Sequence, residues 1–258
     1  FTRHVKVPKI LHDFGDTFHD AGRECYLVGG AIRNMIAGFE VTDYDFATDA
    51  RPEEVMKLFK RVIPTGIKHG TVTVLFRHQK FEVTTYRTEG TYSDGRRPDT
   101  IEYLPSIEED LGRRDFSINS LALDLYTGEL LDLHGGREDI QKGFIRAIGD
   151  PDARFEEDPL RIMRACRFAA QLDFSIEPRT FEAASRLSGR IRSVSAERIR
   201  DEFEKILLSE IPSKGIISMD ATGILAIIIP EMSEGKALEQ KGFHDFNVFT
   251  HSLYSCDS

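Results

Sequence analysis

The chain has 258 residues, 40% of them hydrophobic, which is enough for one large or two modest globular domains with ordinary cores. The longest apolar run, around residues 224–229, is far too short to span a bilayer, so a membrane-spanning protein is excluded. A net charge of −9 excludes a protein that binds nucleic acid with its whole surface, and any nucleic-acid contact must be local.

The N-terminal segment lacks the apolar core of a signal peptide, so we expect a cytoplasmic protein. The three cysteines are widely spaced, a pattern that predicts neither structural disulfides nor a zinc site. Basic residues cluster at positions 96–97, 113–114 and 161–167. Each cluster is either solvated surface charge or part of a local positive stripe.

The first half of the chain alternates between helical and strand patterns. In chain order, the patterns predict a helix at 10–18, a strand at 25–28, a helix behind Gly29 and Gly30, a strand at 44–47, a helix at 52–59, strands at 72–76 and 81–86, and a helix at 117–125. This order predicts an α+β domain in which a small mixed sheet packs against helices. Residues 88–110 are rich in turn formers over an unusual length, and loops that long tend to be functional or disordered.

From about Pro151 onward the patterns are helical only. Helices are predicted at 159–171, 178–187 and 196–208, followed by an apolar segment at 216–229. The change of pattern predicts two domains, one of residues 1–150 and an all-α one of residues 151–258.

Three carboxylates stand out in the first half. Asp43 and Asp45 are two residues apart, so in a strand they would project from the same face, while Glu82 belongs to a separate apolar strand. Neighbouring anions repel unless a cation lies between them, and magnesium prefers such hard oxygen ligands. The alternatives are that the two aspartates are turn residues and that Glu82 faces water. Convergence on two metal ions would instead serve nucleotidyl transfer.

Gly29 and Gly30 separate a predicted strand from a predicted helix. Such a turn directs backbone N–H groups at a bound anion, and Arg33 lies one turn into the helix, an arrangement that suits a triphosphate. The alternatives are a plain tight turn and a surface arginine. Farther along, Arg114 can supply a cation to phosphates, or it belongs to a charged helix start capped by Asp115.

The second half contains a regular series of arginines. Arg161, Arg164 and Arg167 recur every three residues and form one ridge of a helix. A second ridge consists of Leu160, Met163 and Cys166. We expect the apolar ridge to pack and the arginine ridge to be free. Asp158 is a candidate N-cap; beside Arg161 it also offers acceptors and forked donors that suit a base edge, and the later arginines suit phosphates.

Four segments occur in a recognisable order: residues 27–34 (LVGGAIRN), 43–45 (DYD), 113–119 (RRDFSIN) and 157–161 (EDPLR). In that order they closely resemble the class II tRNA nucleotidyltransferases, the CCA-adding enzymes, and their relatives the bacterial poly(A) polymerases. The resemblance extends over residues 24–208. It implies a polymerase-β-like nucleotidyltransferase head followed by an all-α neck and partial body.

The resemblance also implies roles for individual residues. Asp43 and Asp45 match the Mg²⁺ ligands, and Glu82 matches the third catalytic carboxylate. The positions matching nucleotide contacts are Gly29, Gly30, Arg33, Arg114, Asp158, Arg161, Arg164 and Arg167. Asp158 and Arg161 would act as a protein template for incoming CTP or ATP. The implied reaction is in-line attack of a tRNA 3′ hydroxyl on the α-phosphate, with pyrophosphate released. The implied partners are tRNA and nucleoside triphosphates. No membrane partner is implied, and the oligomeric state is left open.

Within the family, the loop at residues 88–99 favours CCA addition or terminal A addition, because enzymes that add only cytidines lack a complete loop there. Two departures are visible: Asn34 replaces the usual aspartate, and the chain stops at Ser258, short of the helical tail that holds the tRNA elbow. The latter indicates a fragment or an unusually small tRNA grip. His244 and Asp245 stand alone, and we assign no second metal site. The competing functions are poly(A) addition to RNA and noncatalytic binding of RNA or nucleotide.

Overall fold

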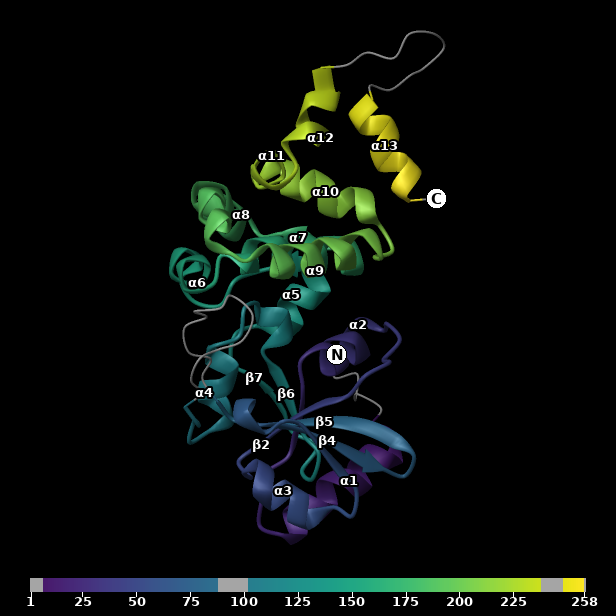
Figure 1. The fold of residues 1–258 in the computed structure, drawn as a ribbon. Helices are drawn as coiled ribbons and strands as arrows, with labels where there is room; N and C mark the ends of the chain where they lie inside the picture. Colours follow the sequence, from purple (N-terminus) through teal and green to yellow (C-terminus); the bar gives the residue numbers. More distant parts are fainter. Residues whose placement is uncertain (1–6, 88–101, 238–247, 258) are drawn as a thin grey trace. The chain divides into compact units, whose positions relative to one another are not determined.

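The structure, a computed structural model, describes residues 7–87, 102–237 and 248–257. The chain divides into two compact units, and the division falls between Lys142 and Gly143, shortly before Pro151, where the purely helical patterns begin (Figure 1). Among the described helices, none is both long and apolar enough to cross a membrane.

The first unit is built on a seven-stranded mixed sheet with the order β3-β4-β5-β2-β1-β6-β7. Its strands are β1 (Tyr26–Val28), β2 (Asp45–Thr48), β3 (Val62–Gly66), β4 (Thr71–Phe76), β5 (Gln79–Thr85), β6 (Leu121–Asp124) and β7 (Leu130–Asp132). All neighbouring strands are antiparallel except β2 and β5, which run parallel. The mixed sheet confirms the predicted α+β class for this half of the chain.

Helices cover both faces of this sheet. They are α1 (Lys9–Asp20), α2 (Gly30–Ala37), α3 (Pro52–Leu58), α4 (Ile107–Gly112) and α5 (Gly136–Lys142), with short 3₁₀ turns η1 (Ile67–His69) and η2 (Ser117–Asn119). Figure 1 shows α1 and α3 on one face, below the sheet as drawn, and α2 on the other. Because strand side chains alternate between faces, the residues of each strand divide between two cores.

The core on the α1 side is a cluster of phenylalanine rings. Phe14 of α1 lies 4.7 Å from Phe46 of β2, 4.8 Å from Phe81 of β5 and 4.9 Å from Phe59, measured between ring centroids. The opposite face carries a smaller apolar cluster to which α4 contributes; its buried members are Val28, Ala47, Tyr86, Ile107, Leu111 and Ala122. The two cores hold the central strands from both sides.

The predicted helix at 117–125 is wrong. Only Ser117–Asn119 forms a helical turn, and the residues after it form the central strand β6. Leu121, Ala122 and Leu123 are all buried, so this strand has no polar face. A short apolar run without alternation cannot be distinguished from a buried helix by its pattern. The edge strands β3 and β7 were not predicted either.

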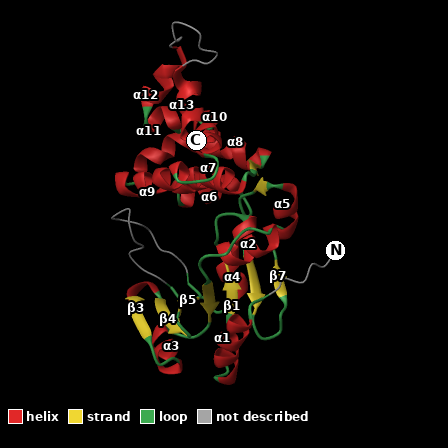
Figure 2. Cartoon of the chain, turned by 90° about the vertical axis from the view of Figure 1, so that its right-hand side faces the viewer, coloured by secondary structure: helices red, strands yellow, loops and turns green. Residues whose placement is uncertain are grey.

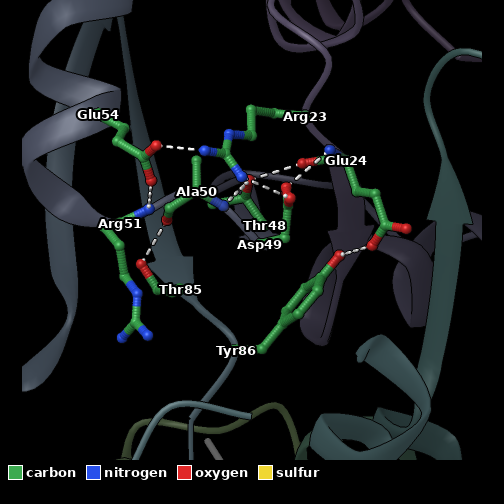
Figure 3. A network of polar contacts seen from close by, with 9 residues as sticks. All are labelled: Arg23, Glu24, Thr48, Asp49, Ala50, Arg51, Glu54, Thr85 and Tyr86. Carbon is green, nitrogen blue, oxygen red and sulfur yellow. Dashed lines mark hydrogen bonds and ion pairs between the residues drawn. The ribbon is translucent and has the colours of Figure 1, made fainter. Parts of the chain in front are cut away.

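A polar network fixes the C-terminal end of β2 (Figure 3). The Thr48 hydroxyl donates to the Glu24 carbonyl at 2.6 Å and accepts from the Ala50 N–H at 3.0 Å. The Thr85 hydroxyl of β5 donates to the Ala50 carbonyl at 2.6 Å, and Arg23 pairs with Asp49 at 3.1 Å. These bonds join the ends of β2 and β5, and so they fix the register of the two strands.

The second unit is mainly helical (Figure 2). Its helices are α6 (Pro151–Glu157), α7 (Leu160–Leu172), α8 (Pro178–Leu187), α9 (Ala196–Leu207), α10 (Pro212–Ala221), α11 (Leu225–Ile228), α12 (Pro230–Glu234) and α13 (Val248–Cys256), with 3₁₀ turns η3 (Ser188–Ser193) and η4 (Gly235–Ala237). A two-stranded parallel ladder, β8 (Phe144–Ile145) with β9 (Ser175–Ile176), corrects the expectation of helices alone after Pro151.

Helix α7 packs against α9 and α10. The contact with α10 depends on Gly215, where a Cβ atom would lie 2.6 Å from Ile206 Cγ2 of α9 and 3.0 Å from Ala170 Cβ of α7. Any side chain at this position would therefore force the three helices apart. Close packing here fixes α9 against the helix that carries the arginine series.

Helix α8 begins with a carboxylate cap at Glu177. Burial alone raises the pKa of Glu177, but hydrogen bonds from the Thr180 backbone N–H (3.0 Å) and hydroxyl (2.9 Å), together with Arg146 at 3.2 Å, hold that pKa below its ordinary value of 4.5. A carboxyl group with a lowered folded-state pKa stabilises the protein above its unfolded-state pKa. This stabilisation is lost as the pH falls through the folded-state pKa.

We therefore expect Glu177→Gln to lower the free energy of unfolding by about 1 kcal/mol at neutral pH, as loss of a charged cap does. The difference in the free energy of unfolding between Glu177→Gln and the unsubstituted protein should become smaller as the pH falls below 4.5. Urea denaturation at several pH values measures both quantities. Glu182→Gln, which changes an exposed residue of the same helix, is the control and should have little effect. A difference that is constant with pH would contradict the capping argument.

Candidate active site

Two of the three predicted carboxylates are partners on neighbouring strands. Asp45 of β2 and Glu82 of β5 lie opposite each other in the parallel register. Both therefore project from the face away from the phenylalanine core. The pKa of Asp45 is raised above its ordinary value because protein atoms crowd its carboxylate, because the Glu82 charge is near, and, more weakly, because Asp43 is near; Arg114 opposes the shift. The anions thus repel one another, as expected of ligands for a cation.

Asp43 differs from the prediction that both aspartates belong to one strand. Strand β2 begins at Asp45, so alternation along a strand does not place Asp43. Asp43 is exposed and accepts a hydrogen bond from the Thr42 hydroxyl at 3.1 Å. Within the described residues, no three histidine, cysteine or acidic side chains form a group that could hold a metal ion. Asp43 is linked to the pair by the effect of its charge on the pKa of Asp45.

The diglycine forms the predicted turn between β1 and α2. Gly29 has φ 67° and ψ −134°, a conformation that favours glycine, and Gly30 is the first residue of α2. Val28, just before the turn, is the register partner of Asp45, so the turn lies beside the carboxylates. The N–H groups of the first turn of α2 therefore lie next to the acidic pair. A phosphate bound to a metal ion at that pair would lie against them.

Arg33 is not the surface residue of the alternative interpretation, because only 9% of it is exposed. Its Nε and Nη2 atoms donate to the Asn34 side-chain oxygen at 3.1 and 2.9 Å. A Cβ atom on Gly30 would lie 3.4 Å from Arg33 Nη2. The buried guanidinium group therefore lies directly against the second glycine of the turn.

Arg114 lies against the first glycine. Its Nη1 would be 3.4 Å from a Cβ atom on Gly29, whereas the nearest Asp45 oxygen would be 3.8 Å from that atom. Arg114 Nη2 donates to Asp110 at 3.0 Å, an ion pair across one turn of chain. Asp115 caps no long helix; it accepts from the Phe116 N–H at 2.8 Å. Two guanidinium groups, two glycines and two carboxylates thus gather at one end of β1 and β2.

The remaining predicted site residues lie in the second unit. Asp158 follows the last residue of α6. Pro159, and not Asp158 as predicted, occupies the N-cap position of α7. Asp158 Oδ1 nevertheless accepts from the Leu160 N–H at 3.1 Å, as a capping group does. Its other oxygen accepts from Arg198 of α9 at 2.8 Å. The carboxylate is thus held at both oxygens.

The arginine ridge of α7 was predicted to be free, and this prediction is wrong. Arg161 pairs with Glu157 at 2.6 Å, and Arg167 pairs with Glu202 of α9 at 2.7 Å. Arg164 is 3.9 Å from the same Glu202. The apolar ridge packs as predicted, since Leu160, Met163 and Cys166 are all buried. The arginines therefore lie half-buried with acidic partners that hold their positions.

Sequence reasoning missed the partners Asp110, Arg198 and Glu202. Asp110 lies four residues before Arg114, a spacing that predicts an ion pair across one turn of a helix. This partner could therefore have been predicted from the sequence. Arg198 and Glu202 also have that spacing, but their partners lie on another helix, and nothing local indicates this. Glu202 is only 4% exposed, and a buried charge of this kind can be recognised only in the folded structure.

Three features noted in the sequence lie outside the described residues. The loop at 88–99, which includes the basic pair at 96–97, is one of them. His244 and Asp245 are the others.

Two family models match the chain. Residues 25–146 match the family described as "Poly A polymerase head domain", and residues 173–236 match "Probable RNA and SrmB- binding site of polymerase A". The CCA-adding enzyme of Lactobacillus helveticus is 50% identical over 202 residues, which are 78% of this chain and 49% of that protein.

Solved structures resemble the chain as well. The Bacillus stearothermophilus CCA-adding enzyme in complex with CTP aligns with a TM-score of 0.77 and 36% identity, over 84% of this chain and 52% of that one. The Thermotoga maritima CCA-adding enzyme complexed with tRNA aligns with a TM-score of 0.70 and 26% identity, over 88% of this chain and 54% of that one. The chain spans about half the length of the relatives it matches.

The fold and the site together define a nucleotidyltransferase head followed by a helical body. This confirms the predicted fold class. Residues 25–146 belong to the poly(A) polymerase head family, and the relatives of the chain named above are CCA-adding enzymes.

Proposed function

We propose that the protein transfers nucleotides from CTP and ATP to the 3′ hydroxyl of tRNA without a nucleic acid template, building or completing the CCA end. The observation that carries the proposal is the register of Asp45 with Glu82 beside the Gly29-Gly30 turn. This arrangement places acidic ligands next to an anion-binding helix start. Relatives named CCA-adding enzyme, of whose length this chain spans about half, support the choice of substrate.

The acidic residues fit divalent metal ions. Asp45 and Glu82, with the charge of Asp43 near Asp45, offer only hard carboxylate oxygens. Burial of the Asp45 carboxylate, and then repulsion by Glu82 and Asp43, raises the pKa of Asp45. We propose Asp43 and Asp45 as the Mg²⁺ ligands and Glu82 as the third catalytic carboxylate. Bound magnesium would lower the pKa of the attacking hydroxyl and stabilise the departing pyrophosphate.

The chain's own residues would bind and orient the nucleotide. The N–H groups that begin α2, with Arg33 and Arg114 against the two glycines, would hold the triphosphate. Arg114 Nε is buried and makes no hydrogen bond to any described residue, so a phosphate oxygen could satisfy it. A fixed triphosphate presents its α-phosphorus for in-line attack, with pyrophosphate as the leaving group.

In the second unit, we propose that Asp158 and Arg161 contact the edge of the incoming base and that Arg164 and Arg167 contact phosphates. Each group is held by an acidic or basic partner, which limits the number of orientations it can adopt. Residues 1–150 would act as the catalytic head, and residues 151–258 as neck and partial body. Cytoplasmic residence belongs to the same proposal, because that compartment holds tRNA and nucleoside triphosphates.

The test is nucleotide incorporation. The protein is incubated with magnesium, labelled CTP or ATP, and tRNA that lacks its CCA end. We expect labelled CMP and AMP on the tRNA 3′ end, and incorporation of neither would overturn the proposal. Binding of RNA or nucleotide that persists without magnesium, with no turnover, would instead identify a noncatalytic module.

Poly(A) addition is the second candidate, because the matching family is described as the poly A polymerase head. Long AMP-only tails on RNA unrelated to tRNA would identify that activity. A tail limited to the missing nucleotides of tRNA would exclude it.

Arg161→Ala should reduce discrimination between CTP and ATP by about tenfold or more, because one buried donor to the base edge is lost. The structural reason is that Glu157 and the Arg154 carbonyl, at 2.6 and 3.2 Å from Arg161 Nη1, fix the guanidinium group. The ratio of kcat/KM values for the two nucleotides measures the effect. Arg200→Ala, at a side chain 70% exposed in the same unit, is the control. Unchanged selectivity in Arg161→Ala would remove the template role.

A further inference from the structure

Asn119, at the end of the 3₁₀ turn η2, accepts hydrogen bonds from Arg33 and Arg114, the two arginines that lie against the diglycine turn. Its side-chain oxygen accepts from Arg33 Nη1 at 2.7 Å, and its backbone oxygen accepts from Arg114 Nη1 at 3.4 Å. The sequence analysis assigned it no role. Asn119 is 7% exposed, so both bonds form largely away from water.

The orientation of the Asn119 amide is determined by its neighbours. Its nitrogen donates to Asp115 Oδ1 at 3.1 Å. An ionised carboxylate can only accept and a guanidinium group can only donate, so the amide must present NH₂ to Asp115 and oxygen to Arg33. Only a side chain with a donor and an acceptor of this length bridges the two charged groups.

The turn that carries Asn119 is itself firmly held. The Ser117 hydroxyl donates to the buried Asp139 of α5 at 2.5 Å. Gly136, at the start of α5, approaches so closely that a Cβ atom would lie 2.3 Å from the Ser117 carbonyl oxygen. Helix α5 thus fixes the turn, and the turn fixes Asn119.

We propose that Asn119 is a positioning residue that holds Arg33 and Arg114 against Gly30 and Gly29, so that both guanidinium groups bind the phosphates of one nucleoside triphosphate. The inference rests on the proposed function for the identity of the ligand. An isolated buried guanidinium group can adopt several rotamers, and only one of them directs it at the turn. Hydrogen bonds from a rigid turn restrict it to that rotamer, which raises affinity by removing the entropy cost of ordering it on binding.

The test uses inorganic tripolyphosphate with magnesium as the probe, because it carries the phosphate chain without a base or sugar. Asn119→Ala should weaken tripolyphosphate binding by about tenfold, the effect of losing one charge-assisted hydrogen bond. Ser120→Ala is the matched control: it deletes a buried hydroxyl, on the neighbouring residue, whose hydrogen bond goes to the Leu111 carbonyl at 2.9 Å. We expect similar losses in melting temperature for the two variants but weakened binding only for Asn119→Ala.

A double substitution tests whether Asn119 acts through its partner. In an Arg33→Ala background, Asn119→Ala should weaken binding little further, since the group it orients is gone. Equal weakening in both backgrounds, equal affinity of Asn119→Ala and the unsubstituted protein, or no tripolyphosphate binding by the unsubstituted protein would each overturn the inference. Loss of tripolyphosphate binding in Asn119→Ala together with no nucleotide incorporation by any form would sustain it while removing the proposed activity.

Discussion

Replacing Asp45 by asparagine is expected to reduce nucleotide incorporation at least about a thousandfold, because a metal ligand beside the phosphate site is lost. The metal-free variant should be no less stable than the unsubstituted protein. The reason is that Asp45 repels Glu82 and Asp43 in the fold, and asparagine keeps the shape while removing the charge. Single-turnover incorporation measures the first effect, and thermal unfolding in a chelator measures the second.

Asp16→Asn is the matched control for this substitution. Asp16 is exposed on α1 in the same unit, so the same chemical change there should leave incorporation and stability near those of the unsubstituted protein. Near-normal incorporation by Asp45→Asn would refute the assignment of this residue as a metal ligand. A marked drop in melting temperature would refute the argument that its charge is repelled in the fold.

Phe14→Ala is expected to destabilise the protein by about 3–5 kcal/mol, the range for removing a buried aromatic ring. Phe14 is fully buried and contacts five other phenylalanine rings, with centroid distances from 4.7 to 5.4 Å. The cavity would open under β2 and β5, which carry the acidic pair. Urea denaturation followed by circular dichroism gives the change in the free energy of unfolding.

Met56→Ala provides the comparison, because Met56 lies in the same unit on α3 and is 40% exposed. It should cost well under about 1 kcal/mol. If the two variants were equally stable, the phenylalanine cluster would not be the main core of this unit.

The elements that were predicted well have an unambiguous local signal. Helix α8 was predicted at residues 178–187 and is found there, because Pro178 suits its first turn and the apolar spacing is helical. Strand β5 alternates between exposed and buried residues around Glu82, which makes its period readable. Strand β6 lacks such alternation because it is buried on both faces, and it was mistaken for a helix.

The same distinction applies to the candidate site. The diglycine turn and the two acids Asp45 and Glu82, taken singly, follow from local patterns, since a strand–glycine–helix order and an acid within an apolar strand can be recognised in sequence. Bonds between distant segments cannot: 86 residues separate Asn119 from Arg33, and Glu202 reaches the arginine series from another helix. Such partners depend on tertiary packing, which no short window of sequence describes.

The parallel pairing of β2 with β5 affects the order in which parts of the protein fold. Parallel neighbours require a long crossover, and here α3, β3 and β4 lie between them along the chain. Closing a loop of that kind is entropically slow, so Asp45 meets Glu82 only after the intervening hairpin has formed. Recovery of catalysis during refolding should then lag behind recovery of helical signal, which makes turnover a reporter of the last stage of assembly.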